Sequence, residues 1–327
     1  MLEHGGRLRE AADYWNIPLD DWVDLSTGIA PWPYPVSIEA GAWRRLPEDG
    51  DGLEAAAAAY YGHPAPLPLP GSQAAIQWLP RLLPVGRAAV PIPGYGEYAP
   101  ALRAAGHEVI ELPPAGLARS DARIILLGRP NNPEGSSLPR AAAIKLAREM
   151  EGRDGWLVVD EAFGDIAPAE SLAALAGTEL PRLAVLRSLG KFFGLAGARV
   201  GFLCAEPGLS ARLAELLGPW AVAHPSRAAA TQALADRAWQ AQQRERLMAA
   251  ALRLRALLGR HGFAARAVGG LFCHVPTPQA AAIHDHMARR GLLLRHFESP
   301  SALRIGLPGE GTHWRRLDAA LTAWKSS

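Results

Sequence analysis

Short apolar runs that alternate with helical segments are the feature of this sequence that most restricts its fold. Six such runs lie between residues 87 and 204, and most are bounded by Gly, Pro, Asp or Arg. They cover residues 87–90, 108–112, 123–127, 156–159, 183–186 and 200–204. Nearly continuous runs of Val, Ile and Leu are typical of strands that are buried on both faces of a mainly parallel sheet.

Helical patterns fill the gaps between these runs, at residues 97–105, 140–151 and 209–217. A further helix is predicted at residues 53–61, where five alanines stand in a row before Gly62 and Pro64, because alanine is the strongest helix former. Alternating strands and helices indicate an α/β layered domain with right-handed crossovers.

The pattern changes after Pro225. Residues 226–259 are nearly free of Gly and Pro, so we expect a long helix there with at most one break. It leads to a smaller C-terminal unit with strands at 271–275, 292–295 and 302–305 and helices at 280–290 and 314–325. The proline-rich residues 29–36 are expected to be an extended arm. The length of 327 residues fits two domains, at roughly 150 residues per domain.

Composition excludes several classes of protein. Lys and Arg total 34 against 32 Asp and Glu, a net charge of +2, which argues against a nucleic-acid partner. The absence of an apolar stretch of 18 residues argues against a membrane partner. The first residues lack the basic-then-apolar order of a signal peptide. Two cysteines, Cys204 and Cys273, are too few for a disulfide framework, so we expect a cytoplasmic protein.

Two glycine-containing segments carry residues that suit chemistry. Ser72 and Gln73 open a predicted helix after Gly71, where free backbone N–H groups and the helix dipole can bind a phosphate; an ordinary serine N-cap is the alternative. Lys191 follows a predicted strand and lies among Leu, Phe and Gly. Burial lowers the pKa of an amine, which suits a nucleophile or a Schiff-base former. A lysine that extends to solvent at a strand end is the alternative.

Three further segments follow strand ends. Asp160 ends an apolar strand and would place a carboxylate at the edge of the sheet where open α/β sheets bind ligands, although a helix N-cap is also possible. Asn132 lies in the segment Arg129-Pro130-Asn131-Asn132-Pro133, which could equally be a simple turn. Tyr95 places an aromatic ring just beyond another strand.

In chain order these segments give a phosphate turn, an aromatic residue, Asn-Pro, Asp, Lys and Arg. That order resembles the fold-type I family of pyridoxal-phosphate (PLP) enzymes over nearly the whole chain. The resemblance implies an α/β fold in which a mainly parallel seven-stranded sheet is flanked by helices. It also implies a large PLP-binding domain at residues 37–240 and a smaller α+β domain built from residues 1–36 and 241–327.

The resemblance assigns a role to each of these residues. Lys191 would hold the cofactor as a Schiff base, and Asp160 would keep the pyridine nitrogen protonated. Asn132 would bond the ring hydroxyl oxygen, and Tyr95 would stack on the ring. The other assignments concern the phosphate, which would be held by the main chain of Ser72 and Gln73, by Ser188 and Arg199, and by Tyr60 from a partner subunit. The role of Tyr60 implies a homodimer with shared active sites, and no metal is expected.

Two arginines near the C-terminus predict a substrate with two anionic ends. Arg304, in Ala302-Leu303-Arg304-Ile305-Gly306, matches the family's arginine for the substrate α-carboxylate, a contact that suits its forked guanidinium. Arg295 matches a position where histidinol-phosphate aminotransferases bind a substrate phosphate, although an exposed charge at a strand end is the alternative. A small phosphorylated amino acid would satisfy both arginines.

Two N-terminal segments indicate which group within the PLP-enzyme family the chain resembles. His4-Gly5-Gly6-Arg7 and Asp24-Leu25-Ser26-Thr27-Gly28 resemble the threonine-phosphate decarboxylases of cobalamin biosynthesis, in which the His-Gly-Gly stretch lies near the substrate phosphate; His4 is therefore a candidate contact. Phe163 departs from the tyrosine of many aminotransferases, and Ala30 and Glu134 depart from an Asn and a Thr. We predict PLP-dependent decarboxylation of L-threonine O-3-phosphate. The alternatives are a histidinol-phosphate aminotransferase and a non-catalytic PLP-binding homologue.

Overall fold

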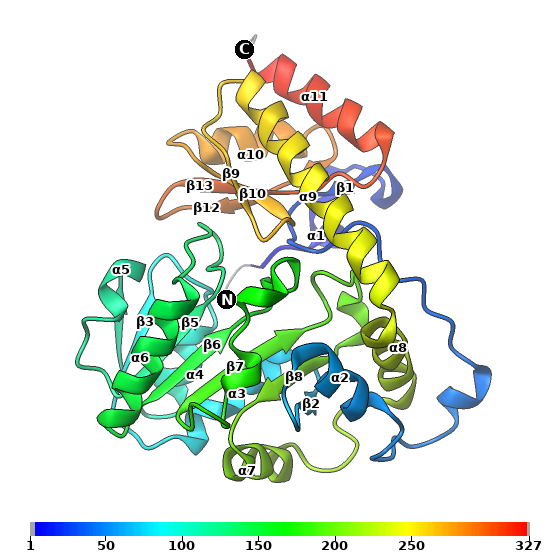
Figure 1. The fold of residues 1–327 in the computed structure, drawn as a ribbon. Coiled ribbons are helices and arrows are strands. Elements are labelled where there is room, and N and C mark those ends of the chain that lie inside the picture. The colour runs from blue at the N-terminus through cyan, green and yellow to red at the C-terminus, as the bar shows by residue number, and fades with distance from the viewer. Residues whose placement is uncertain (1–3, 326–327) are drawn as a thin grey trace. The chain divides into compact units, whose positions relative to one another are not determined.

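The computed structural model describes residues 4–325, which form two compact units. The sheet unit comprises residues 33–132 and 136–241, and the terminal unit comprises the described residues 4–32, 133–135 and 242–325. Each unit therefore gathers segments that are far apart in the sequence, as the colours of Figure 1 show. The long helix α9 (Arg237–Arg260) begins in the sheet unit and continues into the terminal unit.

The sheet unit contains a seven-stranded sheet in the order β2-β8-β7-β6-β5-β3-β4. Its strands are β2 (Leu67–Leu69), β3 (Arg87–Pro91), β4 (Glu108–Leu112), β5 (Ile124–Gly128), β6 (Trp156–Asp160), β7 (Leu183–Ser188) and β8 (Gly201–Cys204). Strands β4, β3, β5, β6 and β7 pair in parallel, whereas β8 runs antiparallel to both β7 and β2. The predicted mainly parallel, seven-stranded α/β fold is confirmed.

Helices pack on this sheet and bury its central strands along their full length. Every residue of β5, β6 and β7 is buried. Helices α3 (Ser72–Leu82), α4 (Tyr98–Ala104) and α7 (Pro207–Leu217) share one apolar core with the strands. The remaining helices of the unit are α2 (Leu53–Tyr61), α5 (Pro114–Leu117), α6 (Arg140–Gly152) and α8 (His224–Ala235); α2 packs against α8, and α6 packs against β6 (Figure 1).

The terminal unit is built around a four-stranded antiparallel sheet in the order β12-β13-β10-β9. Its strands are β9 (Arg266–Val268), β10 (Phe272–Pro276), β12 (Arg295–Phe297) and β13 (Ala302–Gly306). A separate parallel pair joins β1 (Val23–Asp24) to β11 (Leu292–Leu293). The helices of this unit besides α9 are α1 (Leu8–Trp15), α10 (Ala280–Ala288) and α11 (Gly311–Lys325).

The long helix predicted over 226–259 with at most one break is present as α8 and α9, which are separated at Asp236. The backbone of Asp236 is not helical, and its Oδ1 accepts a hydrogen bond from Trp239 N at 2.9 Å. The strand predicted over 292–295 is wrong as one element, because residues 292–293 pair with β1 whereas Arg295 begins a strand that pairs with β13. Strands β1, β2 and β9 and helix α1 were not predicted, since they are short or lack a clear apolar period.

None of the helices formed by residues 4–325 combines the length and the hydropathy needed to cross a lipid bilayer. Both cysteines are free thiols in buried positions, and burial raises the pKa of each to about 12. Within the described part of the chain, no three His, Cys, Asp or Glu side chains gather closely enough to hold a metal ion.

Candidate active site

The start of α3 lies close to Arg199 and to the beginning of β8. A Cβ added to Gly71 would lie 2.7 Å from Arg199 Nη2, and one added to Gly201 would lie 2.4 Å from Ser72 N. Gly201 in turn pairs with Ser188 across β7 and β8. The fold therefore brings together Ser72, Ser188 and Arg199. The first N–H groups of a helix have no partner within it, so this end of α3 can bind an anion.

Asp160 lies at the carboxyl end of β6 and is 8% exposed. Its Oδ1 accepts a hydrogen bond from Ala162 N at 2.9 Å, and its Oδ2 accepts one from the Tyr98 hydroxyl at 3.0 Å. Burial raises the pKa of Asp160, while these two donors and the charges of Lys191 and Arg187 oppose that rise. A buried carboxylate that cations and donors surround is suited to pair with a cationic ring nitrogen.

Lys191 is half-buried just beyond β7. Its Nζ lies 5.5 Å from the centroid of the Phe163 ring, and the next two residues, Phe192 and Phe193, are fully buried. The ammonium group therefore lies beside an aromatic ring, and its charge reaches Asp160. The role of Lys191 as the Schiff-base lysine stays a prediction.

Side-chain hydrogen bonds of Gln73 link the start of α3 to the segment that precedes α4. The Tyr95 hydroxyl donates a hydrogen bond to Gln73 Oε1 at 3.0 Å, and Gln73 Nε2 donates to Glu97 Oε2 at 3.3 Å. The Tyr95 ring lies edge-on to Tyr98, with centroids 5.4 Å apart. Gln73 was expected to act through its main chain, and the structure shows that its side chain also holds Tyr95.

Hydrogen bonds of Asn131 hold the segment that contains Asn132 and Pro133. Asn131 is buried, and its Nδ2 donates a hydrogen bond to Pro93 O at 2.8 Å. Asn131 N also donates to Ser136 O at 2.8 Å. Asn132 itself is half-buried at the end of this part of the sheet unit. The segment is thus the turn that the sequence allowed, and the contact of Asn132 with the cofactor stays a prediction.

Tyr60 has a contact within its own chain. Its hydroxyl donates a hydrogen bond to Asp165 Oδ1 at 3.1 Å, and its ring lies edge-on to Phe193 at 5.6 Å. A contact with a partner subunit's cofactor phosphate stays a prediction.

A buried network of charged side chains lies behind this end of the sheet, and sequence reasoning missed it. Glu161 accepts hydrogen bonds from Arg187 Nη1 at 2.6 Å and from Arg129 Nη1 at 3.4 Å. Arg187 Nη2 also donates to Asp165 Oδ1 at 2.5 Å. Two signals could have revealed it: an arginine inside the apolar strand β7, and a second carboxylate directly after Asp160.

In the terminal unit, basic side chains form a row across the four-stranded sheet. Arg295 pairs with Arg304, Arg304 pairs with His274, and His274 pairs with Arg266. Residues that are directly paired across antiparallel strands share one face of the sheet, so all four lie on the same face. Arg295 and Arg304 are like charges in direct opposition, which is unfavourable. At the other end of the row, Glu134 Oε2 lies 3.7 Å from Arg266 Nη1. Sequence reasoning missed His274 and Arg266.

Arg304 is 8% exposed, and its Nη2 donates a hydrogen bond to Ser26 O at 2.7 Å. Its guanidinium carbon lies 5.2 Å from the centroid of the Phe272 ring. Arg304 is thus held against the N-terminal segment that the sequence singled out. His4 is exposed in the same unit.

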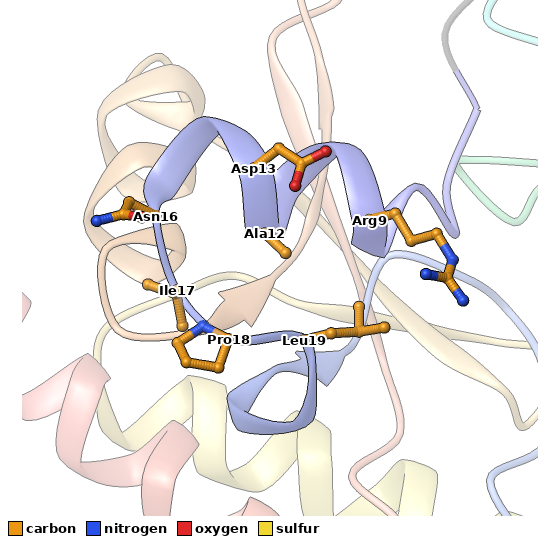
Figure 2. A pocket seen from close by; sticks show the side chains of 7 residues that line it. All are labelled: Arg9, Ala12, Asp13, Asn16, Ile17, Pro18 and Leu19. Atoms are coloured by element: carbon orange, nitrogen blue, oxygen red, sulfur yellow. The ribbon is translucent and has the colours of Figure 1, made fainter.

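A separate pocket lies on α1 and the residues that follow it, as Figure 2 shows. It is lined by seven residues of the terminal unit, Arg9, Ala12, Asp13, Asn16, Ile17, Pro18 and Leu19. The predicted site residues are not among those seven, so this pocket adds nothing to the arrangement described above.

Comparisons with known proteins identify the family of the chain. The family model of class I and II aminotransferases matches residues 47–319. A threonine-phosphate decarboxylase from Pseudomonas aeruginosa is 53% identical over 99% of this chain and 98% of its own length.

Solved structures share the fold at low sequence identity. The histidinol-phosphate aminotransferase of Sinorhizobium meliloti, in complex with pyridoxal-5'-phosphate, has a TM-score of 0.81 at 20% identity and covers 98% of this chain and 94% of its own. L-threonine-O-3-phosphate decarboxylase from Porphyromonas gingivalis has a TM-score of 0.77 at 22% identity, with coverage of 93% and 99%. From the sequence match and the fold together, the chain belongs to the class I and II aminotransferase family.

Proposed function

We propose that this protein is a PLP-dependent decarboxylase that converts L-threonine O-3-phosphate to (R)-1-amino-2-propanol O-2-phosphate and CO₂, a step of cobalamin biosynthesis. The 53% identity to a threonine-phosphate decarboxylase over nearly the full length of both chains supports the reaction. The observation that carries the substrate class is the direct pairing of Arg295 with Arg304 on one face of the terminal sheet. Two adjacent guanidinium groups fit a ligand that has a carboxylate and a phosphate.

The residues of the sheet unit fit PLP. Ser72, Ser188 and Arg199 lie around Gly71 and Gly201 and would supply donors and positive charge to the cofactor phosphate. The buried Asp160 carboxylate suits the cationic pyridine nitrogen. Lys191 supplies the amine for the covalent link, within the electrostatic reach of Asp160. Asn132 and Tyr95 would bond and cover the ring.

When bound, PLP supplies an electron-accepting ring that stabilises the negative charge left at the substrate Cα. Asp160 would keep that ring cationic. Arg304 would bind the α-carboxylate, and Arg295 and His4 would bind the phosphate, so these three side chains decide which Cα bond breaks through positioning alone. When the bond between Cα and the carboxylate breaks, CO₂ leaves and Lys191 donates a proton to Cα. The net change is replacement of CO₂ by that proton.

Phe163 is consistent with this proposal. Its ring lies beside Lys191, and a phenyl group cannot bond the cofactor hydroxyl oxygen as the tyrosine of many aminotransferases would. The protein would thus hold its cofactor with one contact fewer. The same feature disfavours the runner-up, a histidinol-phosphate aminotransferase.

The deciding experiment is incubation of the PLP-loaded protein with O-phospho-L-threonine, followed by measurement of CO₂ and of the amine product. We expect stoichiometric release of both. Absence of CO₂, together with glutamate formation from histidinol phosphate and 2-oxoglutarate, would replace the proposal with the aminotransferase. An absorption band of bound PLP that is lost in Lys191→Ala would support the covalent link to Lys191, and release of CO₂ separates a catalytic protein from a homologue that merely binds PLP.

A homodimer in the cytoplasm is the assembly and location that we propose with this activity. Support for the dimer comes from the resemblance of Tyr60 to a residue that contacts the partner subunit. Light scattering of the purified protein would give a mass of twice 34.9 kDa. A monomer of full activity would contradict shared active sites.

A further inference from the structure

Tyr98, at the start of α4, contacts the carboxylate oxygen of Asp160 that the backbone of Ala162 leaves open. The Tyr98 hydroxyl donates a hydrogen bond to Asp160 Oδ2 at 3.0 Å, while Ala162 N donates to the other oxygen at 2.9 Å. Two donors on two oxygens fix the rotation of a carboxylate, because each bond requires its own oxygen in place.

Tyr98 is itself fixed in place. Its side chain is 2% exposed and belongs to the core that α3, α4 and α7 share with the sheet. Its hydroxyl lies against Gly128 at the end of β5, where an added Cβ would come within 3.3 Å of the tyrosine oxygen. The edge-on ring of Tyr95 packs beside it. A tyrosine packed on all these sides has little freedom to move its hydroxyl away from Asp160.

The charges around this pair make the hydroxyl a donor. Burial and the neighbouring Asp160 raise the pKa of Tyr98 well above its ordinary value, so Tyr98 keeps its proton. The charged groups that reach Asp160 from other elements are Lys191 and Arg187, from β7 and the segment after it. Burial alone favours the protonated carboxyl, and the bond from Tyr98 favours the carboxylate.

We propose that Tyr98 is a positioning residue for the cofactor, whose hydroxyl holds Asp160 in one orientation and in its ionised form, ready to pair with the pyridine nitrogen of PLP. Tyr98 acts through Asp160 and needs no contact with the substrate. This inference rests on the cofactor role proposed for Asp160, and it does not depend on which reaction the protein catalyses.

The test is equilibrium binding of PLP to the apoprotein. Loss of a hydrogen bond to a charged group predicts that Tyr98→Phe binds PLP about tenfold more weakly than the wild type. Tyr61→Phe is the matched control, because Tyr61 is also a buried tyrosine of the sheet unit and its hydroxyl has no hydrogen-bond partner among residues 4–325. Tyr61→Phe should leave PLP affinity unchanged.

The absorption spectrum of bound PLP distinguishes the proposed role from a general loss of packing around Tyr98. The pH midpoint of the absorption band of bound PLP should move in Tyr98→Phe in the same direction as in Asp160→Asn, and by less. A midpoint that stays at the wild-type value would overturn the proposal.

A double-mutant cycle shows whether Tyr98 acts through Asp160. In an Asp160→Ala background, Tyr98→Phe should change PLP affinity less than twofold, because the acceptor is gone. A loss of equal size in both backgrounds would show a merely structural role and overturn the proposal. PLP binding is measured without substrate. The role of Tyr98 can therefore be decided even if the protein fails to decarboxylate O-phospho-L-threonine.

Discussion

At the scale of single residues, Asp160 shows a conflict between stability and cofactor binding. Because burial raises its pKa, the folded apoprotein binds the Asp160 proton more tightly than the unfolded chain does. The associated stability is present at pH values below the unfolded pKa and is lost as the pH rises through the folded pKa. At neutral pH the ionised carboxylate would therefore destabilise the apoprotein, and the cationic ring of the cofactor, if it pairs with Asp160 as proposed, would offset that cost.

Asp160→Asn should accordingly stabilise the apoprotein at pH 8 while it weakens PLP binding. We expect a melting temperature about 2 °C above that of wild-type apoprotein, and a gain that shrinks as the pH falls toward 4. Calorimetry of both apoproteins across this pH range is the measurement. An apoprotein variant that melts below the wild type at pH 8 would contradict this account of the buried charge.

A second prediction for a single residue is that a tyrosine at position 163 can add a hydrogen bond to the cofactor. A tyrosine at this position would add a hydroxyl on the ring that already lies beside Lys191. If that hydroxyl bonds the cofactor oxygen, Phe163→Tyr should bind PLP up to about tenfold more tightly. Fluorescence titration of apoprotein with PLP measures it, with Phe297→Tyr in the terminal unit as the control. Unchanged or weaker affinity in Phe163→Tyr would show that the hydroxyl does not reach the cofactor.

At the scale of elements, the charged network behind the sheet ties three strand ends together. Arg129 follows β5, Glu161 follows β6, and Arg187 lies within β7. All three are at most 4% exposed. Glu161 also accepts hydrogen bonds from Ser171 Oγ at 2.5 Å and from Leu172 N at 2.9 Å. Its carboxylate is therefore the centre on which two buried arginines and a loop converge.

Glu161→Gln should reduce the free energy of unfolding by about 3 kcal/mol, because it removes the carboxylate charge that two buried guanidinium groups share and leaves them with Asp165 and Glu170 as counter-charges. Asp121→Asn is the comparison: it removes the partner of Arg87 in an exposed pair with an Nη1–Oδ2 distance of 2.7 Å, and exposed pairs contribute little. Urea denaturation of the two variants should separate them clearly. Equal losses of unfolding free energy in the two variants would mean that the buried network contributes no more to stability than an exposed ion pair.

At the scale of the whole molecule, the sequence predicted what depends on apolar period and strand-end chemistry. Strand β6 and Asp160 were predictable because a buried apolar run and a terminal carboxylate are local signals. The hydroxyl of Tyr98 was not, because its bond to Asp160 spans 62 positions in the chain. The row of Arg295, Arg304 and His274 was likewise hidden, since register between strands depends on tertiary pairing and not on local pattern.

The division into two units leads to a prediction about where each ligand stabilises the molecule. The residues proposed to hold PLP lie in the sheet unit, whereas Arg295, Arg304 and His4 lie in the terminal unit. A ligand stabilises the native contacts around its own site, by about 2.7 kcal/mol at a concentration of 100 Kd. The two ligands should therefore leave different patterns of protection.

Hydrogen exchange with mass spectrometry measures this directly. PLP added to apoprotein should slow exchange in peptides that cover residues 71–77, 156–163 and 188–201, and leave residues 266–306 near their apoprotein rates. Addition of 3-phosphoglycerate, which has a carboxylate and a phosphate but no amine, to the PLP-loaded protein should then protect the terminal sheet. The variant Arg304→Ala should lose the second effect and keep the first. Protection of both regions by PLP alone would mean that the two units respond to the cofactor as one body, and the anion-binding role of the terminal sheet would lose its support.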